Sequence, residues 1–71
     1  MTVHVEFTRN SRCTEYTFID RHTSEEIAFG SYVTEGGFEV LSFRDGVVDK
    51  YVSAAVAWTS LNRKLQHEYG Y

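Results

Sequence analysis

Hydrophobic and polar residues alternate over much of the first 44 positions of this 71-residue chain. In residues 2–8, Val3, Val5 and Phe7 fall on one side of an extended backbone, and polar residues fall between them. A side-chain period of two is typical of a half-buried β-strand. Similar β-branched and aromatic segments predict three further strands, at residues 13–20, 26–34 and 38–44. Because the connections between them are short, the strands should form an antiparallel meander.

The spacing of the apolar residues becomes helical in the second part of the chain. They recur three or four positions apart, at Tyr51, Ala54, Ala55, Trp58, Leu61 and Leu65. This stripe predicts a helix over residues 49–67, with Asp49 or Asp45 as its N-terminal cap. The expected fold is therefore a single small α+β domain with the order ββββα, in which the helix packs on one face of the sheet.

Two local signals leave the topology open. Asp45-Gly46 is a strong hairpin signal, so a fifth strand could begin at Val47. Tyr51 already fits the helical stripe, however, which favours a loop that leads into the helix. The length of the loop around residues 35–37 is also open, and a change of one residue would exchange the two faces of the strand that follows it.

Both hairpin registers predict large side chains on the sheet face that the helix leaves uncovered. A two-residue loop would place Tyr32, Leu41 and Phe43 there, and a three-residue loop would place Tyr32, Phe38 and Val40 there. Ile19 would join them if Phe18, the preceding residue in the second strand, points inward. The expected core consists of the apolar residues on the other face and under the helix: Val3, Val5, Phe7, Phe29, Val33, Trp58, Leu61 and Leu65.

An uncovered apolar face of this size is typical of an interaction surface, and a symmetric homodimer is the simplest way to cover it. The expected function is therefore that of a non-enzymatic protein-interaction module, such as a regulator, inhibitor or adaptor, which binds through a sheet face or an edge strand. The candidate partner-binding residues are Tyr32, Leu41, Phe43, Ile19 and two tail tyrosines, Tyr69 and Tyr71.

The residues that could carry chemistry do not form a recognisable catalytic or metal-binding pattern. The three histidines lack metal-ligand spacing among themselves and with the single cysteine, Cys13. Cys13 lies beside Arg12, but no base accompanies it. The acidic pairs, Glu25-Glu26 and Asp45 with Asp49, imply no cleft for acid–base chemistry. We therefore expect no enzymatic activity, no metal and no cofactor.

Composition and charge narrow the class of partner. Seven basic and ten acidic residues give a net charge of −3, which weakly disfavours nucleic-acid binding. The alternative function is nevertheless single-stranded nucleic-acid binding through Arg9, Arg12 and Arg21 beside sheet aromatics. The sequence lacks a membrane-spanning apolar run and a signal-peptide pattern, and a lone cysteine suits a reducing compartment. The expected location is the cytoplasm.

Overall fold

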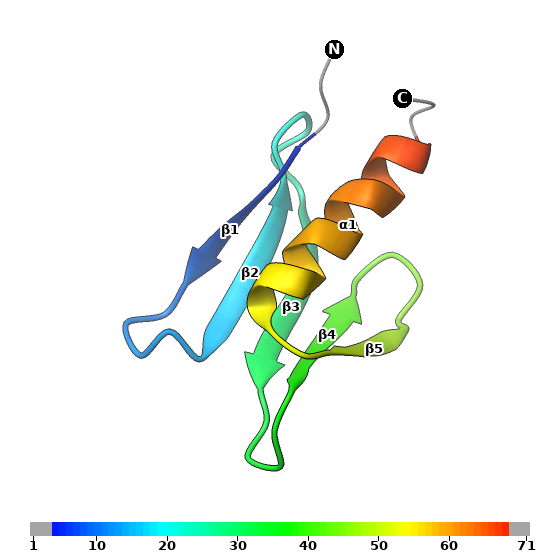
Figure 1. The fold of residues 1–71 in the computed structure, drawn as a ribbon. Coiled ribbons are helices and arrows are strands. Elements are labelled where there is room, and N and C mark those ends of the chain that lie inside the picture. The colour runs from blue at the N-terminus through cyan, green and yellow to red at the C-terminus, as the bar shows by residue number, and fades with distance from the viewer. Residues whose placement is uncertain (1–3, 69–71) are drawn as a thin grey trace.

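The computed structural model describes residues 4–68, which form an antiparallel sheet and one helix (Figure 1). The strands follow one another across the sheet in sequence order: β1 (Val5–Arg9), β2 (Glu15–Asp20), β3 (Glu26–Tyr32), β4 (Phe38–Ser42) and β5 (Val48–Tyr51). Helix α1 (Ala54–Glu68) then lies across one face of the sheet. We call that face the inner face and the opposite face the outer face. The α+β class, the antiparallel meander and the single C-terminal helix agree with the prediction.

The sheet has five strands among the described residues, and the predicted count of four is wrong. β5 pairs with β4, with Val48 opposite Leu41 and Tyr51 opposite Phe38. The turn between the two strands depends on Gly46, whose φ of 71° favours glycine. The Asp45-Gly46 signal therefore does mark a turn between strands.

The stripe of apolar residues predicted a helix that begins at residue 49, but the helix begins at Ala54. Ser53 caps it, since its backbone carbonyl accepts from the Ala57 N–H (3.1 Å) and its hydroxyl accepts from the Val56 N–H (3.3 Å). The Ala54 N–H donates to the Tyr32 hydroxyl (3.1 Å). Asp45 and Asp49, the predicted caps, lie in the preceding turn and strand instead.

The core lies between α1 and the inner face of the sheet. Its buried apolar residues are Val5, Phe18, Ile27, Ala28, Phe38, Val40, Ala54, Ala57, Leu61 and Leu65. The predictions for Val5, Leu61 and Leu65 are confirmed, whereas Trp58 is only partly buried against the core. Phe7 is an exposed inner-face residue and Val33 is a half-buried loop residue, so neither is core. Val3 lies outside the described residues.

A β-bulge explains why the prediction for Phe29 is wrong. Phe18 lies opposite Ala28, but Ile19 lies opposite Glu26, so Ile27 is an extra residue in β3. Ile27 and Ala28 are both buried, and the alternation is shifted by one position from there on. Phe29 consequently lies on the outer face, opposite Leu41 of β4.

The β3–β4 hairpin adopts the alternative in which Tyr32 shares a face with Phe38 and Val40. Tyr32 lies directly opposite Phe38, and the Val33 N–H donates to the Gly37 carbonyl (3.2 Å). This shared face is the inner one, so the prediction that Tyr32 lies on the uncovered face is wrong. The Tyr32 hydroxyl accepts from the first N–H of α1, so this side chain contacts the helix on the inner face.

Gly30, in the middle of β3, makes room for the largest core side chains. A Cβ atom at this position would lie 2.4 Å from Phe38 Cζ and 3.2 Å from Phe18 Cε2. Both phenylalanines are fully buried, and their rings meet edge to face with centroids 6.3 Å apart. The absent side chain at Gly30 thus lets two aromatic rings fill the space under α1.

Candidate protein-interaction surfaces

The outer face carries apolar side chains on several neighbouring strands. We call this group the outer strip and define it by Ile19, Phe29, Leu41, Phe43 and Val48. Leu41 lies opposite Phe29 on one side and opposite Val48 on the other, so their side chains are direct cross-strand neighbours. Leu41, Phe43 and Val48 are 38%, 50% and 55% exposed. No described helix covers this face, since α1 lies on the other side of the sheet (Figure 1).

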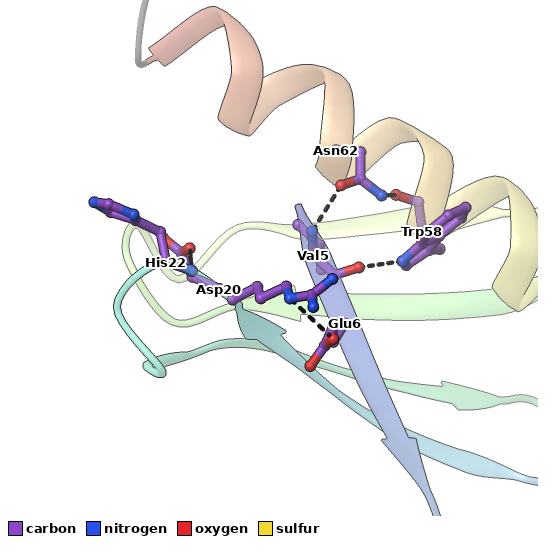
Figure 2. Close-up of polar contacts among 7 residues, drawn as sticks. Val5, Glu6, Asp20, His22, Trp58 and Asn62 are labelled. Carbon is purple, nitrogen blue, oxygen red and sulfur yellow. Dashed lines mark hydrogen bonds and ion pairs between the residues drawn. The ribbon is translucent and has the colours of Figure 1, made fainter. Parts of the chain in front are cut away.

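Charged residues surround the outer strip. Glu39 in β4 forms an ion pair with Lys50 in β5 (3.6 Å). Glu6 in β1 pairs with Arg21 in the β2–β3 loop (3.4 Å), a contact drawn at Glu6 in Figure 2. Glu6, Arg21 and Lys50 are exposed and Glu39 is half-buried, so the pairs contribute little to stability. An apolar centre with a polar rim is the usual composition of a protein–protein contact surface.

Three of the predicted partner-binding residues therefore lie together, and others do not. Ile19, Leu41 and Phe43 belong to the outer strip, and Tyr32 lies on the inner face. Tyr69 and Tyr71 lie outside the described residues. Sequence reasoning missed Phe29 because of the bulge in β3. It missed Val48 because Tyr51 fits the helical stripe, which conceals the strand β5 that the Asp45-Gly46 signal indicates.

The exposed edge of β1 is partly covered by two side chains of α1 (Figure 2). The Val5 N–H donates to Asn62 Oδ1 (2.7 Å), and Trp58 Nε1–H donates to the Val5 carbonyl. Asn62 is fixed in turn, because its Nδ2 donates to the Trp58 carbonyl (3.1 Å). The helix thus satisfies the main-chain groups that a neighbouring strand would bond at this point, which is a known way to protect a sheet edge.

The rest of the β1 edge has main-chain groups that point away from the sheet. The Arg21 N–H donates to the His4 carbonyl (2.9 Å), and the Asn10 N–H donates to the Glu15 carbonyl (3.0 Å). These bonds define the ladder between β1 and β2, in which alternate residues bond the partner strand. By this alternation, the N–H and C=O groups of Phe7 and Arg9 face outward, as those of Val5 do.

A groove of about 280 Å³ lies on the inner face between β1 and the first turn of α1. We call it the β1–α1 groove; its lining includes Phe7, Arg9, Tyr16, Tyr32, Ala55 and Trp58. The Phe7 and Tyr16 rings have centroids 5.4 Å apart. Phe7 is 45% exposed and Tyr32 is 42% exposed, so their rings offer apolar surface to the groove. Sequence reasoning did not predict this groove, since its shape depends on where α1 begins.

The three arginines of the nucleic-acid hypothesis are not brought together. Arg9 ends β1 and Arg12 lies in the following loop, whereas Arg21 lies in the loop after β2. Successive loops of a meander lie at opposite ends of the sheet, and Arg21 already has Glu6 as an ion-pair partner. Phe18, one of the aromatics in that hypothesis, is fully buried and cannot stack on a base.

A second groove, of about 430 Å³, gathers charged side chains between β4, β5 and the second half of α1. Lys64 donates to Asp49 Oδ2 (3.2 Å), and this hydrogen bond raises the pKa of Lys64. The Val47 N–H bonds Asp45 Oδ1 (2.9 Å) and lowers the pKa of Asp45. A general acid or base for neutral pH needs a pKa shifted toward neutrality, and both shifts are in the opposite direction.

Cys13 and His4 are two other candidates for chemistry within residues 4–68. Cys13 is exposed and has a φ of 58° in the β1–β2 loop. The His4 ring meets the Trp58 ring edge-on, with centroids 5.2 Å apart. No group of three or more His, Cys, Asp or Glu residues in the described part of the chain could hold a metal ion. The single described helix is too short and too polar to cross a membrane.

Comparisons of this chain with protein-family models, with curated proteins and with solved structures find no match.

Proposed function

We propose that this protein is a non-enzymatic interaction module that binds protein through the outer strip, and that its first partner is a second copy of the same chain. The observation that supports this proposal is the exposure of Leu41, Phe43 and Val48 on a sheet face that no described element covers. In a monomer this surface would remain in contact with water at a cost of roughly 25 cal/mol per Å². A partner removes that cost.

The accessible surface of this chain is large enough for a face-to-face dimer. A standard interface buries about 800 Å² on each partner, which is about one sixth of the 4936 Å² of accessible surface of this chain. Two sheets pack about 10 Å apart with their strands inclined by about 30°. In that arrangement the outer strips of two copies meet at the centre, and Glu39 and Lys50 lie nearer the rim, where their ion pair stays hydrated.

The proposed role of such a module is regulation, inhibition or adaptation of another protein. Small domains that bury a modest core gain stability from association, so dimerisation supports the fold as well as the function. We also propose a cytoplasmic location, which is supported by an exposed single cysteine that would pair readily in an oxidising compartment.

Sedimentation equilibrium with matched valine variants tests the proposal. Val48→Lys places a charge within the outer strip, whereas Val52→Lys places the same charge at a 79% exposed position outside it. We expect the wild-type chain and Val52→Lys to form dimers at tens of micromolar, and Val48→Lys to weaken the dimer at least tenfold. Circular dichroism confirms that the variants are folded. A wild-type chain that stays monomeric at millimolar concentration would contradict the homodimer.

A capture experiment in the native host tests whether the strip also binds another protein. Tagged wild-type, Val48→Lys and Val52→Lys chains are compared by mass spectrometry. We expect specific proteins to be captured by the wild-type chain and by Val52→Lys and lost with Val48→Lys. Equal capture by all three chains would show that the outer strip is not the binding surface.

A further inference from the structure

The end of β1 that α1 leaves uncovered has the features of a site for strand addition. The main-chain N–H and C=O groups of Phe7 and Arg9 point outward, because His4 and Asn10 bond β2 or its flanking residues and alternate residues of β1 must do the same. An added strand could form four hydrogen bonds with these two residues. Extended peptides bind other domains in this way, with main-chain bonds providing affinity and alternate side chains providing specificity.

The side chains beside this edge specify what the added strand would present. Phe7, Arg9 and Tyr16 all line the β1–α1 groove, so a residue opposite Phe7 would place its side chain against half-exposed aromatic surface. A residue opposite Arg9 would lie next to its guanidinium. Arg9 has no carboxylate partner among residues 4–68, and no acidic side chain lines the groove. A carboxylate at that position would form a cross-strand ion pair.

The helix sets the limit of the added strand. Asn62 and Trp58 already bond the N–H and C=O groups of Val5 (Figure 2), so a partner residue cannot bond there. An antiparallel strand would therefore lie opposite Arg9 first and Phe7 second, and would leave the edge before Val5. Its sequence would place an acidic residue two positions before an aromatic or large aliphatic one.

We propose that the β1 edge and the β1–α1 groove bind an extended peptide segment with the pattern acidic–any–apolar. This site is separate from the outer strip, because it uses the inner face and the edge of β1. The occupant is a segment of another protein, and it pairs with Phe7 and Arg9 through its backbone.

Two synthetic peptides test the proposal by amide NMR on the full chain: acetyl-Thr-Thr-Asp-Thr-Phe-Thr-Thr-amide and the same peptide with Lys in place of Asp. We expect the first to shift the Phe7 and Arg9 amide signals and to bind about threefold to tenfold more tightly than the second, as cross-strand charge pairs predict. Arg9→Glu should reverse this preference. Arg12→Glu makes the same charge change in an exposed loop outside the groove and should leave it unchanged.

Backbone methylation distinguishes strand addition from loose association in the groove. In the proposed register, the peptide Phe N–H donates to the Phe7 carbonyl, and the N–H of the central Thr points away from β1. N-methylation of the Phe should therefore abolish binding, whereas N-methylation of the central Thr should not. Equal effects of the two methyl groups would contradict the proposal.

The remaining outcomes also decide the question. If neither peptide shifts the Phe7 and Arg9 amides at several millimolar, the site does not bind this class of segment. If those signals shift with protein concentration alone, a second copy occupies the edge and the proposed occupant is wrong. Val48→Lys should leave peptide binding intact, so a failure of the outer-strip proposal and a failure of this one are distinguishable.

Discussion

Replacing Gly30 by Ala tests whether the packing of two phenylalanines explains the glycine in the middle of β3. The new Cβ would lie 2.4 Å from Phe38 Cζ and 2.5 Å from Phe38 Cε1. Carbon atoms in good contact are about 3.5–4.0 Å apart, so the Phe38 ring must move by about 1 Å. It is fully buried and contacts the Phe18 ring, and such overpacking costs about 1–3 kcal/mol.

One favourable effect opposes this cost. Ala restricts the unfolded chain more than Gly does, which stabilises the folded state by about 0.4–1 kcal/mol. The net expectation for Gly30→Ala is a loss of about 1–2 kcal/mol in the free energy of unfolding. For a domain of this size, each kcal/mol corresponds to about 4–8 °C in melting temperature.

Urea unfolding followed by Trp58 fluorescence and by far-UV circular dichroism measures this loss. The decisive control is the same substitution in a Phe38→Leu background, because Leu lacks the ring atoms that the new methyl group would contact. We expect Gly30→Ala to cost little or nothing there, which corresponds to a coupling energy of about 1–2 kcal/mol, within the range for residues in contact. An equal loss in both backgrounds, or no loss in the wild-type background, would refute the packing explanation.

Other predictions concern the β1 edge and the β4–β5 turn. Asn62→Leu leaves the Val5 N–H without its partner and should destabilise the fold by about 1–3 kcal/mol in urea unfolding. Trp58→Phe removes the donor to the Val5 carbonyl and also part of a ring that packs against the core, so it should cost more than the roughly 0.5–1.5 kcal/mol of a lost hydrogen bond alone; a smaller loss would contradict the assigned bond. The Val47 N–H holds the pKa of Asp45 below its ordinary value of 3.8. A lowered carboxyl pKa stabilises the fold above pH 3.8, and this contribution is lost as the pH falls through the folded-state pKa. The stability difference between the wild-type chain and Asp45→Asn should therefore change below pH 4 and stay constant from pH 5 to 7, as urea unfolding at each pH will show.

The fold class could be predicted from the sequence because period-two segments and one helical stripe dominate the chain. The start of the helix could not be predicted from the stripe, because Tyr51 satisfies both spacings: it is inward-facing in β5 and also lies four positions before Ala55. Only the cross-strand pairing of Tyr51 with Phe38 decides between them.

Part of the outer strip could also be predicted from the period of two in the side chains. Leu41 in β4 and Phe43 directly after β4 lie on one face because their spacing is two, and that face is fixed relative to β3 once the hairpin register is known. The bulge at Ile27 has no local sequence signal, and it alone moves Phe29 from the expected core to the outer face. The β1–α1 groove depends on contacts between residues more than 50 positions apart, which periodicity does not report.

The bonds from Trp58 and Asn62 to Val5 join one of the earliest described residues to the C-terminal helix. During synthesis, β1 emerges from the ribosome well before α1, so the N–H and C=O groups of Val5 lack their helix partners throughout that interval and extend the open edge of β1. Contacts of such large sequence separation also form late and slow the folding reaction. We therefore expect nascent chains of this protein to need protection from aggregation until the helix has been made.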